Sequence, residues 1–502
     1  MTKFLIVLLL ILGCETEIPT EQKEEDYLGQ KCLSLIKIDN YFCFIDDSTN
    51  TILYPITNNS EINGLIEYSD NYYDNILIND SLILNNSIYN FGNITTNDTV
   101  NIKTVIEGEI NNYELFFTTL PTVMFYTNQN IVDEPKIPSK ILINDIISNN
   151  SYNFYSGIEI RGGTSEHWPK SSYDIELWED ENGLENKKEE LFSLRDDDDW
   201  ILDAMYLDLS KSRNIIGMQI WESFASANYT PIEEDFRLGQ NGITIELFVN
   251  NEYLGIYSFN EPIDRKQLQL NQSSGILYKS EIRTPESSME GIESEPIDYS
   301  AWNGFQLKYP EIFDETAWIP LKELIELVAY SEDQIFSDSI EELIDIDNAI
   351  DYFIFINIIQ AFDNMAKNMF IMRYDQNHRL AFIPWDLDLS FGIAPSTDFG
   401  DWVTINSIMH NRLFDRLYNL DVNGYRNKVK VAWNEISSQL NLHTEIFNRF
   451  NERINSVIES KAHLRENKKW ILNSDINDEL NHINSWVNSR IILFEDYINN
   501  NY

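Results

Sequence analysis

Residues 361–392 read AFDNMAKNMFIMRYDQNHRLAFIPWDLDLSFG, and several groups able to do chemistry stand close together in this stretch. Asp363 and Asn368 are five positions apart, so one short element carries a carboxylate and a carboxamide. Asp386 and Asp388 follow, and their side chains share a face if the residue between them lies on a strand. Oxygen ligands gathered in this way suit Mg²⁺, which binds through a few carboxylates and keeps several waters. The stretch therefore predicts a divalent-metal site built from two neighbouring segments.

The flanking sequence indicates how this stretch folds. Residues 350–359 form an apolar run that suits a buried element, and residues 379–384 read as a strand that leads into the acidic turn. Taken alone, the Asp363–Asn368 spacing also fits a solvated helix face, because a chain rich in Asp and Asn repeats such a pattern by chance. The apolar neighbours favour the metal-site interpretation.

Composition bounds the class of protein. The chain has 502 residues, which predicts two to four domains, and its formal net charge is −46 with a pI near 4.3. Such a charge repels nucleic acid, so DNA or RNA partners are not expected. It also repels ATP, so a nucleotide site here needs local cations or a metal. Hydrophobic and aromatic contents of 43% and 13% are sufficient for packed cores, so the acidity does not indicate disorder.

The amino terminus predicts export and a lipid anchor. Residues 1–14 combine one Lys, an apolar run too short to span a bilayer, and a lipoprotein-like ending at Cys14, although an ordinary signal peptide also fits. Residues 15–27 are polar and acidic, as expected of a tether, so we expect an extracytoplasmic protein attached to the bacterial cell envelope through Cys14. Cys32 and Cys43 could pair in an oxidising compartment. The three cysteines and six histidines predict no zinc site.

The rest of the chain divides into three regions. Residues 28–119 hold short β-rich runs split by Asn and Asp, which predicts a small β-sandwich. Residues 120–395 alternate strand and helix patterns and include a hairpin at 243–259, whose Asn250-Asn251 turn tolerates positive φ. Residues 396–502 carry helical periodicity and predict a helical lobe packed on the core. The fold class is therefore α+β.

A second group of candidate residues lies around the loop at 162–170. Its two glycines let the backbone approach an anion, and Arg161 and Lys170 are cations in a chain that has only 36 Lys and Arg. Lys279 ends a strand and could face the same site. These residues suit phosphate binding. Structural roles also fit: the loop could be a surface hairpin loop, and Lys279 could be a strand-edge Lys that discourages aggregation.

Two further features favour structural roles. Arg213 stands early in a helix, where pairing with a core carboxylate is favoured over phosphate binding. The acidic run 196–199 lacks the glycine-punctuated spacing of a calcium loop, so we interpret it as a solvated turn.

Taken in order, these pieces resemble a known family. They are residues 120–121, 160–163, 169–173, 199–200, 212–214, 249–257, 261–264, 277–279, 363–368 and 385–392. Together they resemble the CotH kinase family, atypical protein kinases related to a spore coat protein, from about residue 120 to the carboxyl terminus. The resemblance implies a divergent two-lobed protein-kinase-like core with a helical C-terminal lobe. It also implies Mg²⁺- or Mn²⁺-dependent transfer of the ATP γ-phosphoryl group to Ser or Thr of a protein.

The resemblance also implies roles for the residues of the metal site. Asp363 would be the base that orients the acceptor hydroxyl. Asp386 would hold Mg²⁺ with Asn368 as a second ligand, and Asp388 would be a further ligand or would stabilise the turn.

For the nucleotide, the resemblance implies that Lys170, and less directly Lys279, contact the phosphates, with Arg161 as a further phosphate partner. Glu261 would lie in the hinge between the lobes, near the adenine. The loop here reads Arg-Gly-Gly-Thr-Ser at 161–165, where the family often has Arg-Gly-Asn-Ser-Ser.

Two other functions fit the sequence. One is a non-catalytic surface protein that uses a kinase-like scaffold for envelope assembly or adhesion, which the scarcity of ATP outside the cytoplasm favours. The other is a carbohydrate-active enzyme that uses Asp386 and Asp388 as paired carboxylates. The presence of Asp363, Asn368 and Asp386 together favours the kinase.

Overall fold

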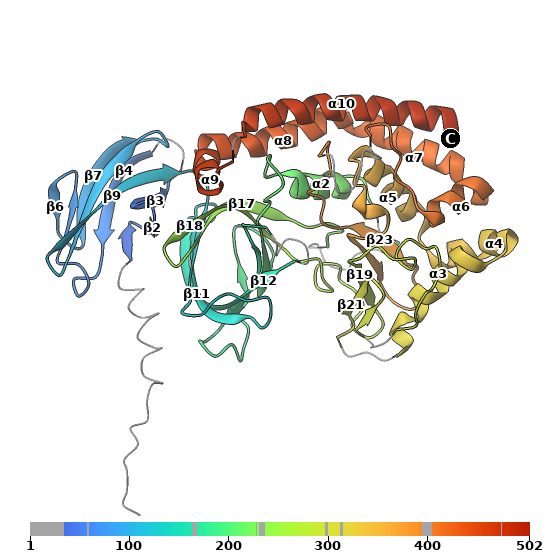
Figure 1. Cartoon of the computed structure of the whole chain (residues 1–502), viewed down its shortest axis with the longest axis horizontal. Coiled ribbons are helices and arrows are strands. Elements are labelled where there is room, and N and C mark those ends of the chain that lie inside the picture. The colour runs from blue at the N-terminus through green and yellow to red at the C-terminus, as the bar shows by residue number, and fades with distance from the viewer. Residues whose placement is uncertain are drawn as a thin grey trace, which may run out of the picture.

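The computed structural model describes residues 35–57, 60–162, 168–226, 228–229, 236–296, 300–311, 315–393, 404–472 and 474–502. Figure 1 shows an all-β domain at one end, a β-barrel beside it, and a second sheet with its helices at the other end. Two long helices, α8 and α10, run over the barrel side and the second sheet alike. The predicted leader and tether, including Cys14, and the predicted thiol partner Cys32 lie outside the described residues.

The N-terminal domain is one nine-stranded sheet in the order β6-β5-β8-β9-β3-β2-β1-β4-β7. Its halves share a core, in which Ile38 and Ile66 of one half meet Ile102 and Leu115 of the other. Cys43 is a buried free thiol. The prediction of an all-β domain is confirmed. The strands are β1 Ile36–Ile38, β2 Tyr41–Asp46, β3 Thr51–Pro55, β4 Ser60–Glu67, β5 Asn75–Ile78, β6 Ser81–Ile83, β7 Ser87–Ile94, β8 Thr99–Ile106 and β9 Glu109–Thr118.

A closed barrel follows, in the order β10-β11-β12-β13-β16-β18-β17, and it closes where β10 pairs with β17 in parallel. The predicted hairpin is confirmed as β17 and β18, and its turn residues Asn250 and Asn251 have φ values of 50° and 61°. The strands are β10 Thr122–Tyr126, β11 Ile137–Asp145, β12 Asn150–Arg161, β13 Ser172–Trp178, β16 Asp199–Asp203, β17 Gly242–Val249 and β18 Glu252–Asn260, with a side ribbon of β14 Glu189–Glu190 and β15 Asp196–Asp197.

After the barrel, a five-stranded sheet has the order β20-β21-β19-β22-β23. The predicted buried run lies mostly in α5, whose N-cap Asp345 accepts hydrogen bonds from two backbone N–H groups and whose residues are nearly all buried. The elements are α2 Arg213–Glu222, β19 Ile276–Ser280, β20 Ala301–Trp302, β21 Phe305–Tyr309, η2 Glu315–Trp318, α3 Ile319–Tyr330, α4 Asp333–Leu343, α5 Ile346–Ile358, η3 Asp363–Met365, β22 Met369–Arg373 and β23 Ala381–Pro384.

The C-terminal region is helical, as predicted, and shares one continuous hydrophobic core with the five-stranded sheet. Within it α10 packs along α8 and reaches α5, while α9 packs against β18 of the barrel. The mixed α+β prediction is therefore confirmed. No helix among the described residues has both the length and the apolar character needed to cross a bilayer. The elements are α6 Arg412–Leu420, η5 Val422–Gly424, α7 Tyr425–Leu440, α8 Leu442–Glu459, α9 Ala462–Trp470 and α10 Ile476–Asn501.

Candidate functional site

A single hairpin brings the two predicted segments together. Strands β22 and β23 pair so that Met369 faces Pro384, which places Asn368 and Trp385 side by side at the open end. The Trp385 N–H donates to the Asn368 carbonyl at 2.9 Å. The buried side chain of Asn364 donates to the carbonyls of both Asn368 (2.5 Å) and Trp385 (2.9 Å). The carboxamide segment and the acidic turn are thus fixed to each other by backbone hydrogen bonds.

Asp363 begins the short helix η3, at the other end of the carboxamide segment. It is buried, and one carboxylate oxygen lies 3.0 Å from the Nζ of Lys367, a cation that the sequence did not single out. The loop is held from the sheet, because the Asn368 N–H donates to the Ser280 carbonyl at 2.9 Å. Asp363 therefore has a fixed place and a positive neighbour.

The acidic turn lies outside the strands. Residues 386–389 form no strand, and Asp386 has a φ of +56°, so Asp386 and Asp388 do not share the face of a strand. The reason is local packing: the backbone leaves the sheet after Pro384, and Leu387 is buried against Gly217 of α2, where an added Cβ would meet its Cδ1 at 2.7 Å. The carboxyl groups of Asp386 and Asp388 nevertheless stay close enough to influence each other.

The carboxyl groups of this turn are crowded by negative charge. Asp386 is exposed on one side, yet burial by the atoms around it, followed by the charges of Asp203 and Asp363, raises the pKa of its carboxyl to about 6. Burial and the charges of Asp386 and Asp203 raise the pKa of Asp388 well above its usual range. We call Asp203, Asp363, Asp386 and Asp388 the acidic site. Within the described part of the chain, Asp363 is the member of the acidic site that forms an ion pair, with Lys367.

Asp203 is the member of the acidic site that sequence reasoning missed. It ends barrel strand β16, and one oxygen accepts a hydrogen bond from the Met205 N–H at 2.9 Å. Asn214 of α2 donates to the other oxygen at 3.2 Å and accepts the Leu387 N–H at 3.2 Å. One amide thus ties the barrel to the acidic turn. An acid at the end of a strand is too common a signal to have been selected from sequence alone.

The predicted cations Arg161 and Lys279 meet at one aromatic ring. Arg161 ends β12 and its guanidinium carbon lies 5.7 Å from the centre of the Trp385 ring, while the Nζ of Lys279 on β19 lies 5.9 Å from it. Each also pairs with an acid, Arg161 with Asp174 at 2.7 Å and Lys279 with Glu281 at 2.9 Å. The structure therefore places both cations next to the residue that precedes Asp386.

Lys308 of β21 is a third cation in this neighbourhood. Its pKa is lowered, first by burial and then by the positive charge of Lys279, with a smaller contribution from Arg161. In the sheet Gln306 faces Lys279, and Lys308 stands at the register shift between Leu307 and Tyr309. Three cations from the barrel and the sheet are thus gathered beside the acidic site in a strongly acidic chain.

Lys170 occupies a different environment. Its side chain is fully buried, and its Nζ lies 2.9 Å from a carboxylate oxygen of Glu466 on α9 and donates to the Ile256 carbonyl at 2.5 Å. Lys211 approaches the same carboxylate at 3.2 Å. Burial lowers the pKa of Lys170 to about 8, and the charge of Asp203 acts on it in the opposite sense. Its predicted contact with a phosphate stays a prediction, and residues 163–167 of the adjoining loop lie outside the described part of the chain.

Glu466 reaches the barrel through a gap at Gly255. The register of the β17–β18 hairpin shifts there, Gly255 has a φ of +101°, and an added Cβ would lie 1.9 Å from a carboxylate oxygen of Glu466. The Ile256 N–H donates to Glu466 at 2.8 Å. Burial would raise the pKa of Glu466, but Lys170 and Lys211 lower it overall.

Glu261 stands where the chain leaves the barrel, directly after β18, and is almost fully buried. One carboxylate oxygen accepts the Arg195 N–H at 2.8 Å, and the other has no hydrogen-bond partner. Its backbone N–H donates to Asn241, and its carbonyl accepts from the side chain of Gln240. Its position between barrel and sheet fits an interlobe connection, and its contact with adenine stays a prediction.

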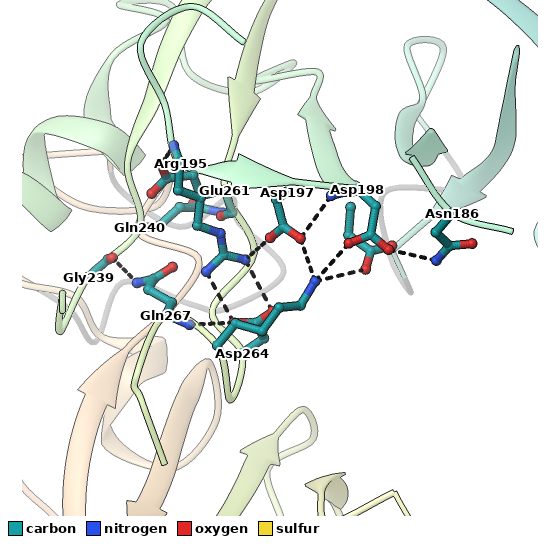
Figure 2. Close-up of polar contacts among 11 residues, drawn as sticks. Asn186, Arg195, Asp197, Asp198, Gly239, Gln240, Glu261, Asp264 and Gln267 are labelled. Carbon is teal, nitrogen blue, oxygen red and sulfur yellow. Dashed lines mark hydrogen bonds and ion pairs between the residues drawn. The ribbon is translucent and has the colours of Figure 1, made fainter. Parts of the chain in front are cut away.

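Figure 2 shows the polar network beside Glu261, and it corrects the interpretation of the acidic run. Asp197 and Asp198 are buried rather than solvated: Arg195 pairs with Asp197, and Lys266 pairs with both acids. The solvated-turn prediction was wrong because Arg195, directly before the run, pairs with Asp197, and Lys266 comes from a distant part of the chain. Glu176, Asp198 and Asp199 place carboxylate oxygens within 4.8 Å of one another, but Lys266 already supplies a cation there.

The favoured structural role of Arg213 agrees with its contacts. Its fully buried guanidinium pairs with Asp208 at 2.6 Å and with Glu479, and it donates to the Ser390 carbonyl at 2.9 Å. It thereby connects α2 to α10 and to the end of the acidic turn.

Comparison with known proteins identifies the family. The family model described as CotH kinase protein matches residues 158–492, which is more than half of the 502 residues and spans the acidic site, the cations around Trp385 and α9. No curated protein matches the chain. The chain belongs to the CotH kinase protein family.

Proposed function

We propose that this protein is a CotH-type protein kinase that transfers the γ-phosphoryl group of ATP to Ser or Thr of a surface or secreted protein, using Mg²⁺ or Mn²⁺. The observation that carries the proposal is the acidic site, which gathers four carboxylates beside Lys367 and next to the cations around Trp385. In this proposal the barrel and the sheet-and-helix region correspond to the two lobes of a divergent kinase.

The donor set fits a hard divalent cation. Carboxylate and amide oxygens are the ligands that Mg²⁺ prefers. Burial, followed by repulsion among close carboxylates, raises the pKa of Asp386 and Asp388, and a bound cation would relieve the repulsion. Asp386 and Asn368 would hold the metal, with Asp388 or Asp203 as a further ligand. When bound, the metal would neutralise charge on the phosphates.

The chain's own residues would provide positioning and charge. Asp363 would orient the acceptor hydroxyl and accept its proton, with the Nζ of Lys367 3.0 Å from its carboxylate. Arg161 and Lys279, beside Trp385, would offset the negative charge of the nucleotide in a chain whose net charge is −46. Asn364 and Asn214 would hold the reacting segments in register.

The test is incubation of the purified protein with labelled ATP, Mg²⁺ or Mn²⁺, and generic Ser and Thr acceptors. Asp363→Asn should reduce transfer by about 10²–10⁴-fold while leaving nucleotide binding intact. Asp386→Asn should impair metal-dependent binding as well. Asp496→Asn, an exposed change on α10, is the matched control and should transfer like the unaltered protein.

Two results would contradict the proposal. One is transfer by both site variants at the level of the control. The other is no transfer and no nucleotide-dependent rise in melting temperature in the unaltered protein, which would favour a non-catalytic role in envelope assembly or adhesion.

The proposal also places the protein outside the cytoplasm, anchored to the envelope through lipid on Cys14. Cells fed a labelled fatty acid should label the protein, and Cys14→Ser should abolish the label. Equal labelling of the variant would rule out this anchor.

A further inference from the structure

Helices α3 and α4 lie at the end of the molecule opposite the N-terminal domain (Figure 1), and side chains of both line a groove. The groove has a volume of about 550 Å³ and is lined by one face of each helix. Glu323, Glu326, Leu327 and Tyr330 follow the i, i+3, i+4, i+7 spacing of a single face of α3, and Glu342 and Leu343 contribute from α4.

The lining combines apolar and acidic side chains. Leu327 and Leu343 are partly buried against the core, and Tyr330 is 61% exposed. Ile335 is 53% exposed and lies one turn before Ser339 and two turns before Leu343 on α4. It therefore adds an apolar side chain on the same face of the helix. A volume of this size lies within the range of ligand-binding sites.

None of Glu323, Glu326 and Glu342 forms an ion pair in the described part of the chain, although Lys322 and Glu326 are close enough for their charges to interact. Nearby cations are already paired elsewhere, Lys322 with Glu295 at 2.7 Å and Lys428 with Glu341 at 3.0 Å. Arg416 is directed to the carbonyl groups at the end of α3 and to Asp333 at 2.9 Å. The charges of Glu323, Glu326 and Glu342 therefore remain for an external partner.

We infer that the α3–α4 groove binds a cationic amphipathic helical segment of a partner protein, with its aliphatic side chains against Leu327, Leu343 and Tyr330 and its Lys or Arg side chains against the three glutamates. An apolar floor between acidic rims complements such a helix in both shape and charge. With a net charge of −46, the chain itself is a poor source of this segment. The segment belongs to the protein that is phosphorylated; this assignment rests on the proposed function, whereas binding itself needs no nucleotide.

The test uses fluorescence anisotropy with the full chain and a labelled Leu/Lys peptide of about 18 residues whose Leu side chains repeat with helical periodicity. Two comparison peptides replace Lys by Glu or scramble the Leu positions. Glu326→Gln/Glu342→Gln and Ile335→Asn are the groove variants. Glu452→Gln/Glu495→Gln, exposed changes on α8 and α10, is the matched control.

The expected result is binding of the amphipathic Leu/Lys peptide that weakens with salt and falls about 5- to 10-fold in the double groove variant. Ile335→Asn should also weaken it, while the control should bind as the unaltered protein does. Asp363→Asn should bind the peptide normally, so loss of transfer and loss of docking are separable. Equal binding of the Glu peptide, equal binding by both groove variants, or no binding at all would overturn the inference.

Discussion

The acidic site and the cluster formed by Lys170, Lys211 and Glu466 differ in how far their charges are compensated within the chain. In the cluster, two ammonium groups share one carboxylate, and the pKa of Glu466 is lowered. In the acidic site, carboxylates face one another, and the pKa of Asp386 is raised to about 6. Charge that is compensated within the chain holds elements together, whereas uncompensated charge is kept at a cost in stability and is available to a ligand.

Glu466→Ala gives the largest expected effect, because it leaves Lys170 and Lys211 buried without a carboxylate. We expect a loss of about 3–5 kcal/mol in the free energy of unfolding, measured by thermal and denaturant unfolding. The matched control is Glu252→Ala, which removes the exposed ion pair with Lys469 on the same helix and should cost less than about 1 kcal/mol. Equal losses would show that the buried cluster is not the structural connection described.

Gly255→Ala tests the same connection from the barrel side. The new methyl group would meet Glu466 and would sit on a backbone of φ +101°, so we expect a loss of about 2–3 kcal/mol. Gly108→Ala, at φ +82° with no atom within 4 Å, isolates the backbone strain and should cost less. If the two variants lose the same stability, the approach of Glu466 contributes nothing.

Asp386→Asn should act in the opposite direction on the acidic site. Removing one charge from the crowded carboxylates should stabilise the metal-free protein by about 1 kcal/mol, because solvent screens the exposed carboxylate of Asp386. The same variant should lose the rise in melting temperature that Mg²⁺ or Mn²⁺ gives the unaltered protein. A destabilised variant that still responds to metal would contradict the contrast between the two centres.

Asp351 gives the smallest effect and tests whether a raised pKa alone marks a ligand site. Burial, followed by the charges of Asp345 and Asp347, raises its pKa to about 7, although it lies on α5 next to Ser226. Because this exceeds the value in an unfolded chain, the folded state binds more protons between about pH 4 and 7, and stability falls as pH rises through that window. Asp351→Asn should flatten the dependence of stability on pH by about 1 kcal/mol per pH unit. It should not alter phosphoryl transfer. An unchanged slope would show that Asp351 does not cause the fall in stability between about pH 4 and 7.

The convergence of Asp363, Asn368 and Asp386 could be predicted because one hairpin connects them within a short stretch of sequence. Asp203 could not, since it comes from a distant strand and carries no motif. Glu466 could not be paired with Lys170, because 296 residues separate them. The burial of Asp197 and Asp198 depends on Arg195 and Lys266, so the acidic run alone gave the wrong environment. Local sequence patterns therefore predicted helices, strands and the geometry within short segments. They did not predict ion pairs between residues that are distant in the sequence.

The pairing of Lys170 with Glu466 also bears on the order in which the protein is made. Every strand of the barrel has been synthesised once residue 260 leaves the ribosome, yet the carboxylate for Lys170 appears only 206 residues later, since 466 − 260 = 206. Until then the ammonium group of Lys170 stays hydrated or pairs with another group, and the barrel cannot reach its final packing. We expect nascent chains that stop before α9 to be proteolysed more readily in the barrel than chains that extend past it.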